Sequence, residues 1–186
     1  MRDITMLVAH CDDEVIFGWP VLPRAKKIIC CSSDANNPAR AWCKDRKKAL
    51  IEICDMFGIE MVCFNHNSEF YKMDARAGEL IKFQNEITPH LREGLVFTHN
   101  VWGEYGHMDH ILVNQIALAS GMPLLTTDIC IDAGWLKCAP APQGNKIQDC
   151  DIDLDLYNRC KAVYDKYGCW TWSKAPVMKA SLYENN

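Results

Sequence analysis

The stretch Ile4-Thr5-Met6-Leu7-Val8-Ala9 is a short, almost wholly apolar run, and His10-Cys11-Asp12-Asp13-Glu14 follows it directly. Such a run is typical of a strand buried on both faces of a mostly parallel sheet. Three further runs have the same character: Lys27–Cys31, Met61–Phe64 and Leu95–Thr98. The segments between them have helical patterns, namely Ala39–Met56, Ala75–Leu91 and Asp109–Ala119. Because strands and helices alternate, the sequence predicts an α/β fold with a Rossmann-like, mostly parallel sheet flanked by helices.

The length of 186 residues is typical of one domain, which we expect to span residues 1–186. The strand and helix alternation occupies about residues 4–120. Residues 121–186 are rich in Gly and Pro and are expected to add an edge strand, a loop and a packing helix around Ile152–Tyr164. The segment after Asp13 is short and contains Pro20 and Pro23, so its helix should be a stub.

The composition excludes several classes of protein. Hydrophobic residues make up 49% and charged residues 24%, as in an ordinary soluble globule. The net charge is −4 and no dense basic stretch occurs, which argues against a nucleic-acid partner. No apolar run approaches the roughly 18 residues of a membrane span. The first apolar run is also too short for a signal-peptide core, so a cytoplasmic location is expected.

Eleven cysteines are unusual for this length, and they suggest either disulfides or a metal cluster. A cytoplasmic protein keeps its thiols reduced. No cysteine has another three positions further on, so the spacing argues against a zinc ribbon. The cysteines are therefore interpreted as small buried hydrophobic residues.

Chemically active side chains collect where the predicted strands end, which is where ligands bind in open α/β sheets. Five of the six histidines lie at or just beyond such an end: His10, His66, His99, His107 and His110. The three consecutive acids after His10 concentrate negative charge that a cation would offset, although acids also favour a helix start by complementing its dipole.

One ligand set for a catalytic zinc is His10, Asp13 and His110, which supplies nitrogen and oxygen donors and leaves a position open for water. Asp12 is then free to act as a general base on that water. The same set of two imidazoles and one carboxylate also suits Fe(II).

The second cluster, Gly106-His107-Met108-Asp109-His110, lies at the start of a predicted helix. His107 is placed to stabilise an oxyanion or to protonate a leaving amine. Asp109 is expected either to orient an imidazole or simply to begin the helix.

At these positions the chain resembles the PIG-L / LmbE-like zinc-dependent deacetylases. Residues 9–14 resemble that family's Ala-His-Pro-Asp-Asp-Glu motif, and residues 106–110 resemble its His-Pro-Asp-His motif, in the expected order. The resemblance covers about residues 4–120. It implies zinc on His10, Asp13 and His110, with Asp12 as base and His107 as electrophile. It also implies a small-molecule substrate, an N-acetylglucosamine-type amino sugar or sugar conjugate.

The resemblance also implies substrate contacts. Arg46, with Gly58 twelve positions on, matches an arginine of the family that contacts substrate. The loop from His99 to Gly106 resembles one that walls the sugar pocket, in which Trp102 would stack on the sugar and Asn100 or Glu104 would bind hydroxyls. Cys11 replaces the family's proline and is expected to pack away from the metal.

The sequence thus predicts a zinc-dependent hydrolase that removes an N-acetyl group from an amino sugar. One alternative is hydrolysis of another amide or ester at the same site. A second alternative is a non-catalytic, thiol-rich metal-binding protein.

Overall fold

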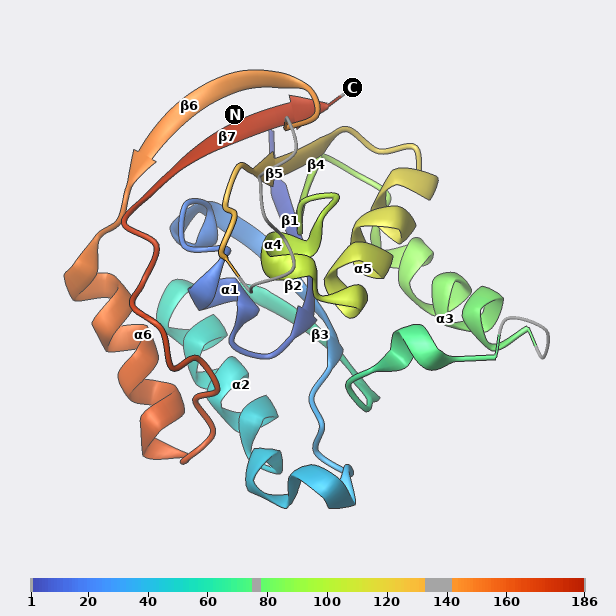
Figure 1. Ribbon diagram of the computed structural model, residues 1–186, viewed down its shortest axis with the longest axis vertical. Coiled ribbons are helices and arrows are strands. Elements are labelled where there is room, and N and C mark those ends of the chain that lie inside the picture. Colours follow the sequence, from blue (N-terminus) through green and yellow to red (C-terminus); the bar gives the residue numbers. More distant parts are fainter. Residues whose placement is uncertain (1, 75–77, 133–141, 186) are drawn as a thin grey trace.

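The computed structural model describes residues 2–74, 78–132 and 142–185. One seven-stranded sheet, in the order β3-β2-β1-β4-β5-β7-β6, crosses the molecule (Figure 1). Its strands are β1 (Ile4–His10), β2 (Ala25–Ser32), β3 (Glu60–His66), β4 (Leu95–Thr98), β5 (Leu124–Thr127), β6 (Asn145–Asp151) and β7 (Lys179–Asn185). The pairs among β1 to β5 are parallel, whereas β7 pairs antiparallel with both β5 and β6. The prediction of a mostly parallel α/β sheet is confirmed.

Helices cover both faces of this sheet. They are α1 (Asp13–Ile16), α2 (Arg46–Phe57), α3 (Glu79–Ile87), α4 (Gly103–Gly106), α5 (Met108–Ala119) and α6 (Leu154–Lys166). Short 3-10 turns occur at η1 (Leu22–Arg24), η2 (Pro38–Cys43), η3 (Phe70–Lys72) and η4 (Thr88–His90). Helices α2 and α6 lie on one side of the sheet, and α3 and α5 on the other (Figure 1). None of the helices in the described ranges has the length and apolar character needed to span a membrane.

The burial of strand β1 on both faces explains why its sequence is almost wholly apolar. Met6 and Val8 pack into the core beneath α2 and α6, whereas Leu7 and Ala9 pack into the core beneath α3 and α5. Successive side chains of a strand point to opposite faces, so a strand covered on both sides needs apolar residues at every position.

The helices differ from their predicted bounds at prolines and caps. The predicted helix Ala39–Met56 is divided, because η2 begins at Pro38 and the backbone of Arg40 is not helical. For the predicted helix Ala75–Leu91, residues 75–77 lie outside the described residues, and α3 ends before Pro89. The predicted stub after Asp13 is confirmed as the four-residue α1.

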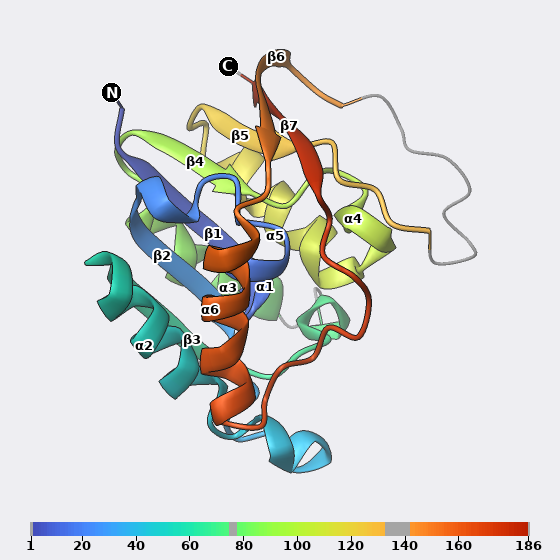
Figure 2. The ribbon, with the colours of Figure 1, turned by 90° about the vertical axis from the view of Figure 1, so that its left-hand side faces the viewer.

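The end of the chain contains more sheet than predicted. Strand β5 is not the edge strand, because β7 and β6 extend the sheet beyond it. Six of the seven β6 residues are exposed, so the strand lacks the apolar alternation by which strands are found in sequences. Between β6 and β7, α6 crosses to the α2 face, and the segment after it runs back along the molecule to β7 (Figure 2).

Candidate metal-binding and catalytic site

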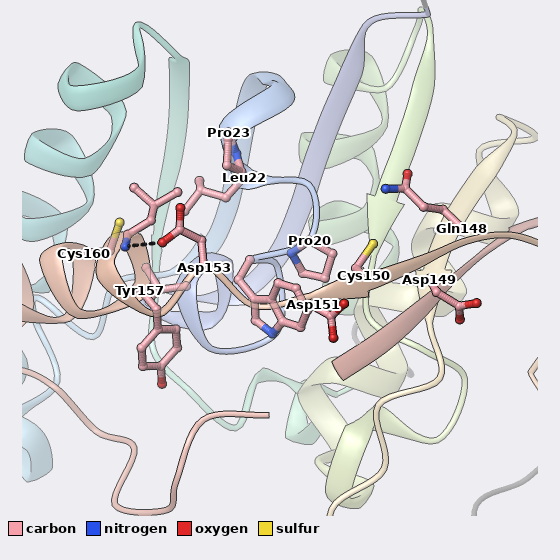
Figure 3. Close-up of a pocket in the computed structure, with 13 residues that line it drawn as sticks. Pro20, Leu22, Pro23, Gln148, Asp149, Cys150, Asp151, Asp153, Tyr157 and Cys160 are labelled. Atoms are coloured by element: carbon pink, nitrogen blue, oxygen red, sulfur yellow. Dashed lines mark hydrogen bonds between the residues drawn. The ribbon is translucent and has the colours of Figure 1, made fainter. Parts of the chain in front are cut away.

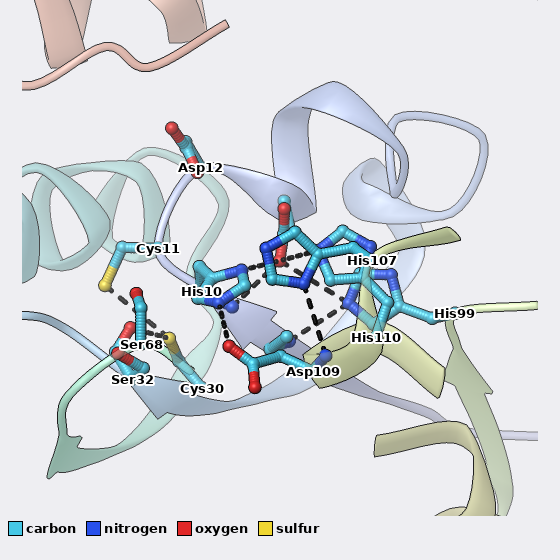
Figure 4. Close-up of polar contacts among 12 residues, drawn as sticks. His10, Cys11, Asp12, Cys30, Ser32, Ser68, His99, His107, Asp109 and His110 are labelled. Carbon is cyan, nitrogen blue, oxygen red and sulfur yellow. Dashed lines mark hydrogen bonds and ion pairs between the residues drawn. The ribbon is translucent and has the colours of Figure 1, made fainter. Parts of the chain in front are cut away.

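The chain turns sharply where β1 ends. Asp12 adopts a left-handed backbone conformation, with φ 92°, and α1 begins at the next residue. A non-glycine residue at such an angle is strained and is held by its surroundings. The turn sends neighbouring carboxylates to different partners. Asp13 joins a group of imidazoles, whereas Asp12 lies apart from that group (Figure 4) and contacts Arg46.

Asp13 lies at the centre of the imidazole group. Its Oδ2 is 3.2 Å from Nδ1 of His10 and 3.4 Å from Nε2 of His110. Burial would raise the pKa of Asp13, but His110 and His10 outweigh it and hold the pKa well below its usual value. The Nε2 atom of His110 is buried and has no hydrogen-bond partner within the described part of the chain.

Two further carboxylates hold the outer nitrogens of these rings. Oδ2 of Asp109 is 3.0 Å from Nε2 of His10, and Oε2 of Glu104 is 2.7 Å from Nδ1 of His110. The same Glu104 oxygen is 3.0 Å from Nδ1 of His99. Burial would raise the pKa of Glu104, but the imidazoles lower it to about 2. With their outer nitrogens fixed, His10 and His110 present their other nitrogens to Asp13, an arrangement typical of metal-binding histidines.

Two overlapping sets of side chains have metal-ligating atoms within 4.8 Å of one another: His10, His107 and His110, and Asp13, His99 and His110. Metal–ligand distances of about 2.0–2.2 Å in a tetrahedral site place neighbouring ligand atoms about 3.4 Å apart. The separations from Asp13 to His10 and to His110 match this value. Nε2 of His99 instead accepts the backbone N–H of Ala9 at 3.0 Å, which occupies its lone pair.

Both carboxylate oxygens of Asp12 accept hydrogen bonds. Nη2 of Arg46 lies 2.5 Å from one carboxylate oxygen, and the hydroxyl of Thr171 donates to the other at 2.5 Å. Arg46 is only 1% exposed, and its guanidinium also contacts the carbonyl of Cys11. Burial raises the pKa of Asp12, and the charge of Arg46 offsets part of this rise.

His107 caps the N-terminus of α5. Its Nδ1 accepts the backbone N–H of Asp109 at 3.2 Å. Burial, His110 and His10 together lower the pKa of His107 to about 3, so the ring is neutral near pH 7. A neutral ring that accepts through Nδ1 carries its proton on Nε2. His107 therefore offers a hydrogen-bond donor at the site.

Part of this site opens onto a cavity of about 600 Å³, whereas His110 and Asp109 lie buried behind its lining. Its lining includes five predicted site residues: His10, Asp12, Asp13, Arg46 and His107. It also includes residues outside the predicted set of site residues, among them Arg40, Trp42, Tyr105, Thr171, Trp172 and Lys174. The residues after position 170 come from the far end of the chain, and no local pattern in the sequence links them to the site.

The loop predicted to wall the sugar pocket has another role in the structure. Trp102 is buried, and its indole N–H donates to the carbonyl of Ile129 at 3.1 Å. The Asn100 side chain donates to the same carbonyl at 2.7 Å. His99 and Glu104 are buried behind the imidazoles. None of these four predicted substrate residues is among the residues that line the cavity.

Two other predicted features are resolved by the contacts. His66 does not join the site, because its Nε2 pairs with the exposed Glu86 at 2.8 Å. Cys11 points away from the imidazoles toward Cys30, as expected. A second cavity, of about 380 Å³, lies between η1, β6 and α6 and contains none of the predicted site residues (Figure 3).

Comparisons with known proteins agree with this fold. No protein-family model matches the chain. An uncharacterized protein of Acanthamoeba polyphaga mimivirus is 25% identical over an alignment of 139 residues that covers 67% of this chain and 60% of that protein. The chain thus spans less than two thirds of the length of that relative.

Two solved structures resemble the whole chain. The crystal structure of the A40926 pseudoaglycone deacetylase matches with a TM-score of 0.64 and 15% identity, over 98% of this chain and 96% of that one. The crystal structure of a deacetylase–teicoplanin complex from the teicoplanin biosynthesis pathway matches with a TM-score of 0.66 and 13% identity, over 98% and 97%. At these identities the likeness shows a shared α/β fold.

Proposed function

We propose that this protein is a metal-dependent N-deacetylase of the PIG-L / LmbE-like type, acting on an N-acetylated amino sugar or sugar conjugate. The observation that carries the proposal is that the Asp12 carboxylate lines one cavity together with Asp13, His10 and His107. Both structural neighbours described above are deacetylases by their names, which supports the same reaction class for this chain.

In this proposal, His10, Asp13 and His110 hold the metal. The buried Nε2 of His110, without a hydrogen-bond partner in the described ranges, is the kind of atom that a metal satisfies. Two imidazoles and a carboxylate suit zinc, and they also suit Fe(II). A bound divalent metal would supply Lewis acidity and lower the pKa of water toward neutrality.

Asp12 would accept the proton of the attacking water as general base. Arg46 and Thr171 fix the orientation of its carboxylate. Oδ2 accepts both the hydroxyl and the backbone N–H of Thr171, whereas Oδ1 accepts from Arg46 and keeps a lone pair for the water. We assign Arg46 to positioning this base, because its guanidinium is already engaged by Asp12. This differs from the direct substrate contact that the family resemblance implied.

His107 would donate a hydrogen bond from its Nε2–H to the amide oxygen as negative charge develops there, and the departing amine would take the proton that Asp12 has accepted from the water. Its neutral state suits this role, because a neutral imidazole with a fixed tautomer is a defined donor. Asp109 fixes two imidazole rings. Its backbone N–H donates to His107, and its carboxylate contacts Nε2 of His10.

The test is the isosteric variant Asp12→Asn. We expect acetate release from N-acetylglucosamine conjugates to fall by about 10²–10⁴-fold, which is the usual contribution of a general base. Zinc content per chain should stay at the wild-type value, because Asp12 is not among the proposed ligands. The control is Asp45→Asn, which alters a carboxylate near α2 that pairs with Lys48.

Wild-type rates in Asp12→Asn would overturn the assignment of the base. If the wild-type protein with bound zinc released acetate from none of a panel of N-acetylated sugars, the deacetylase proposal itself would fail. Turnover of another ester or amide by that protein would then favour the alternative hydrolase.

A further inference from the structure

Three thiols converge beside the catalytic loop. Cys11 follows β1, Cys30 lies in β2 and Cys63 lies in β3. The sulfurs of Cys11 and Cys30 are 3.5 Å apart, and Cys30 and Cys63 are direct neighbours in the parallel register of β2 and β3. All three sulfurs lie within 4.8 Å of one another. We call these residues the thiol cluster.

The spacing of the cysteines argued against a zinc ribbon, but spacing along the chain does not test contacts between strands. The parallel pairing of β2 and β3, together with the turn after β1, brings these three residues together. The fold therefore places three thiols together that no Cys-x2-Cys pattern in the sequence would predict.

The dimensions of the cluster fit a metal ion bound by three sulfurs. A metal–sulfur distance of about 2.3 Å in a trigonal arrangement places the sulfurs about 4.0 Å apart. The sulfurs of Cys11 and Cys30 lie somewhat closer than this, at 3.5 Å, and the other two pairs lie within 4.8 Å. Cys11 and Cys30 are fully buried, whereas Cys63 is partly exposed on β3, which is an edge strand. An ion can therefore reach the cluster past Cys63.

The surroundings also suit a site of concentrated negative charge. The guanidinium of Arg46 contacts the carbonyl of Cys11, so a buried cation lies next to the cluster. Ser32 lies beside Cys30 in Figure 4, and its buried Oγ lacks a hydrogen-bond partner in the part of the chain that the structure describes. A hydroxyl there can donate to a bound thiolate.

The donor set selects the kind of ion. Structural zinc takes four ligands, whereas the cluster offers three sulfurs, and its set within the described residues includes no histidine or carboxylate. Soft thiolate ligands select Cu(I). We propose that Cys11, Cys30 and Cys63 form a second metal site, distinct from the imidazole site, that binds one soft monovalent ion such as Cu(I). This proposal does not depend on the deacetylase function.

The test is an anaerobic titration of the full chain with Cu(I) against a chromogenic Cu(I) chelator. We expect wild-type protein to retain one Cu(I) at chelator concentrations that strip any further equivalents. Cys63→Ala should bind this ion at least about 10–100-fold more weakly, because the loss of even an outer partner of a metal ligand has an effect of that size. The control Cys160→Ala removes a buried thiol of α6 outside the cluster and should bind as wild type does.

A second measurement uses only the wild-type protein, so it does not depend on how variants fold. One equivalent of Cu(I) should slow alkylation of Cys63, mapped by mass spectrometry, and leave alkylation of the half-exposed Cys130 unchanged. Equal Cu(I) affinity in wild type and Cys63→Ala, or equal protection of Cys63 and Cys130, would overturn the proposal.

Discussion

Glu104 offers a sensitive test of how the imidazole group is held. Its carboxylate accepts from His110 and His99 through Oε2 and from the backbone N–H of Asn100 through Oε1. Glu104→Gln keeps the shape but leaves one accepting oxygen in place of two. Whichever way the glutamine amide is turned, its NH₂ group faces an N–H donor, either that of His110 or that of Asn100. At least one hydrogen bond is therefore lost.

The size of the effect follows from these contacts. Loss of a carboxylate behind a metal-binding histidine costs about 10–100-fold in metal affinity, or roughly 1.4–2.7 kcal/mol. Glu104 is only 1% exposed, so water cannot replace the lost acceptor. Losing at least one charge-assisted hydrogen bond should also lower the free energy of unfolding of the metal-free protein by about 1.5–3 kcal/mol.

The assay is competition for Zn²⁺ between the protein and a chromogenic chelator, together with urea unfolding after metal removal. Glu86→Gln is a matched control, because Glu86 also pairs with a histidine, His66, but on the exposed surface. It should change neither quantity by more than a few tenths of a kcal/mol. Wild-type zinc affinity in Glu104→Gln would refute the reasoning that Glu104 positions a ligand.

Three further substitutions probe other contacts of the site. Thr171→Val removes the hydroxyl that donates to Asp12, so we expect kcat to fall about tenfold. Thr171→Ser keeps the hydroxyl and should restore kcat. An unchanged kcat in the valine variant would show that the hydroxyl does not position the base. Trp172→Ala removes an aromatic wall of the cavity and should raise KM several-fold with little change in kcat, whereas Trp172→Phe should stay close to wild type; a fall in kcat alone would contradict this. Tyr164→Phe deletes the buried hydrogen bond from its hydroxyl to Glu14 at 2.6 Å and should lower the free energy of unfolding by about 1–3 kcal/mol without loss of zinc, which urea unfolding and metal analysis would check.

The parallel part of the sheet could be predicted because its information is local. In β1, β2 and β4, each apolar run is itself the buried strand, so composition and position coincide. The grouping of His10, Asp13 and His110 could be predicted for the same reason. The rule that ligands bind at the carboxyl ends of strands needs only the order of the elements. The exposed β6 has no such local signature, and it was missed.

The remainder of the site depends on contacts between distant residues. The position of Glu104 suggested a sugar ligand, but in the structure its burial makes it an acceptor for two imidazoles. The contact of Thr171 with Asp12 joins residues 159 positions apart, and the thiol cluster requires the register of three strands. Spacing along the chain carries no signal for such contacts.

The hydrogen bond from Thr171 to Asp12 makes the proposed base depend on a late step of folding. Thr171 is carried by the segment between α6 and β7, and β7 is placed only when it pairs with β5. Contacts of such high sequence separation form slowly during folding. A chain that ended before position 171 would retain every residue of the imidazole group but lack this hydroxyl. The orientation of the Asp12 carboxylate thus depends on a contact that cannot form until the segment after α6 has folded against the turn after β1.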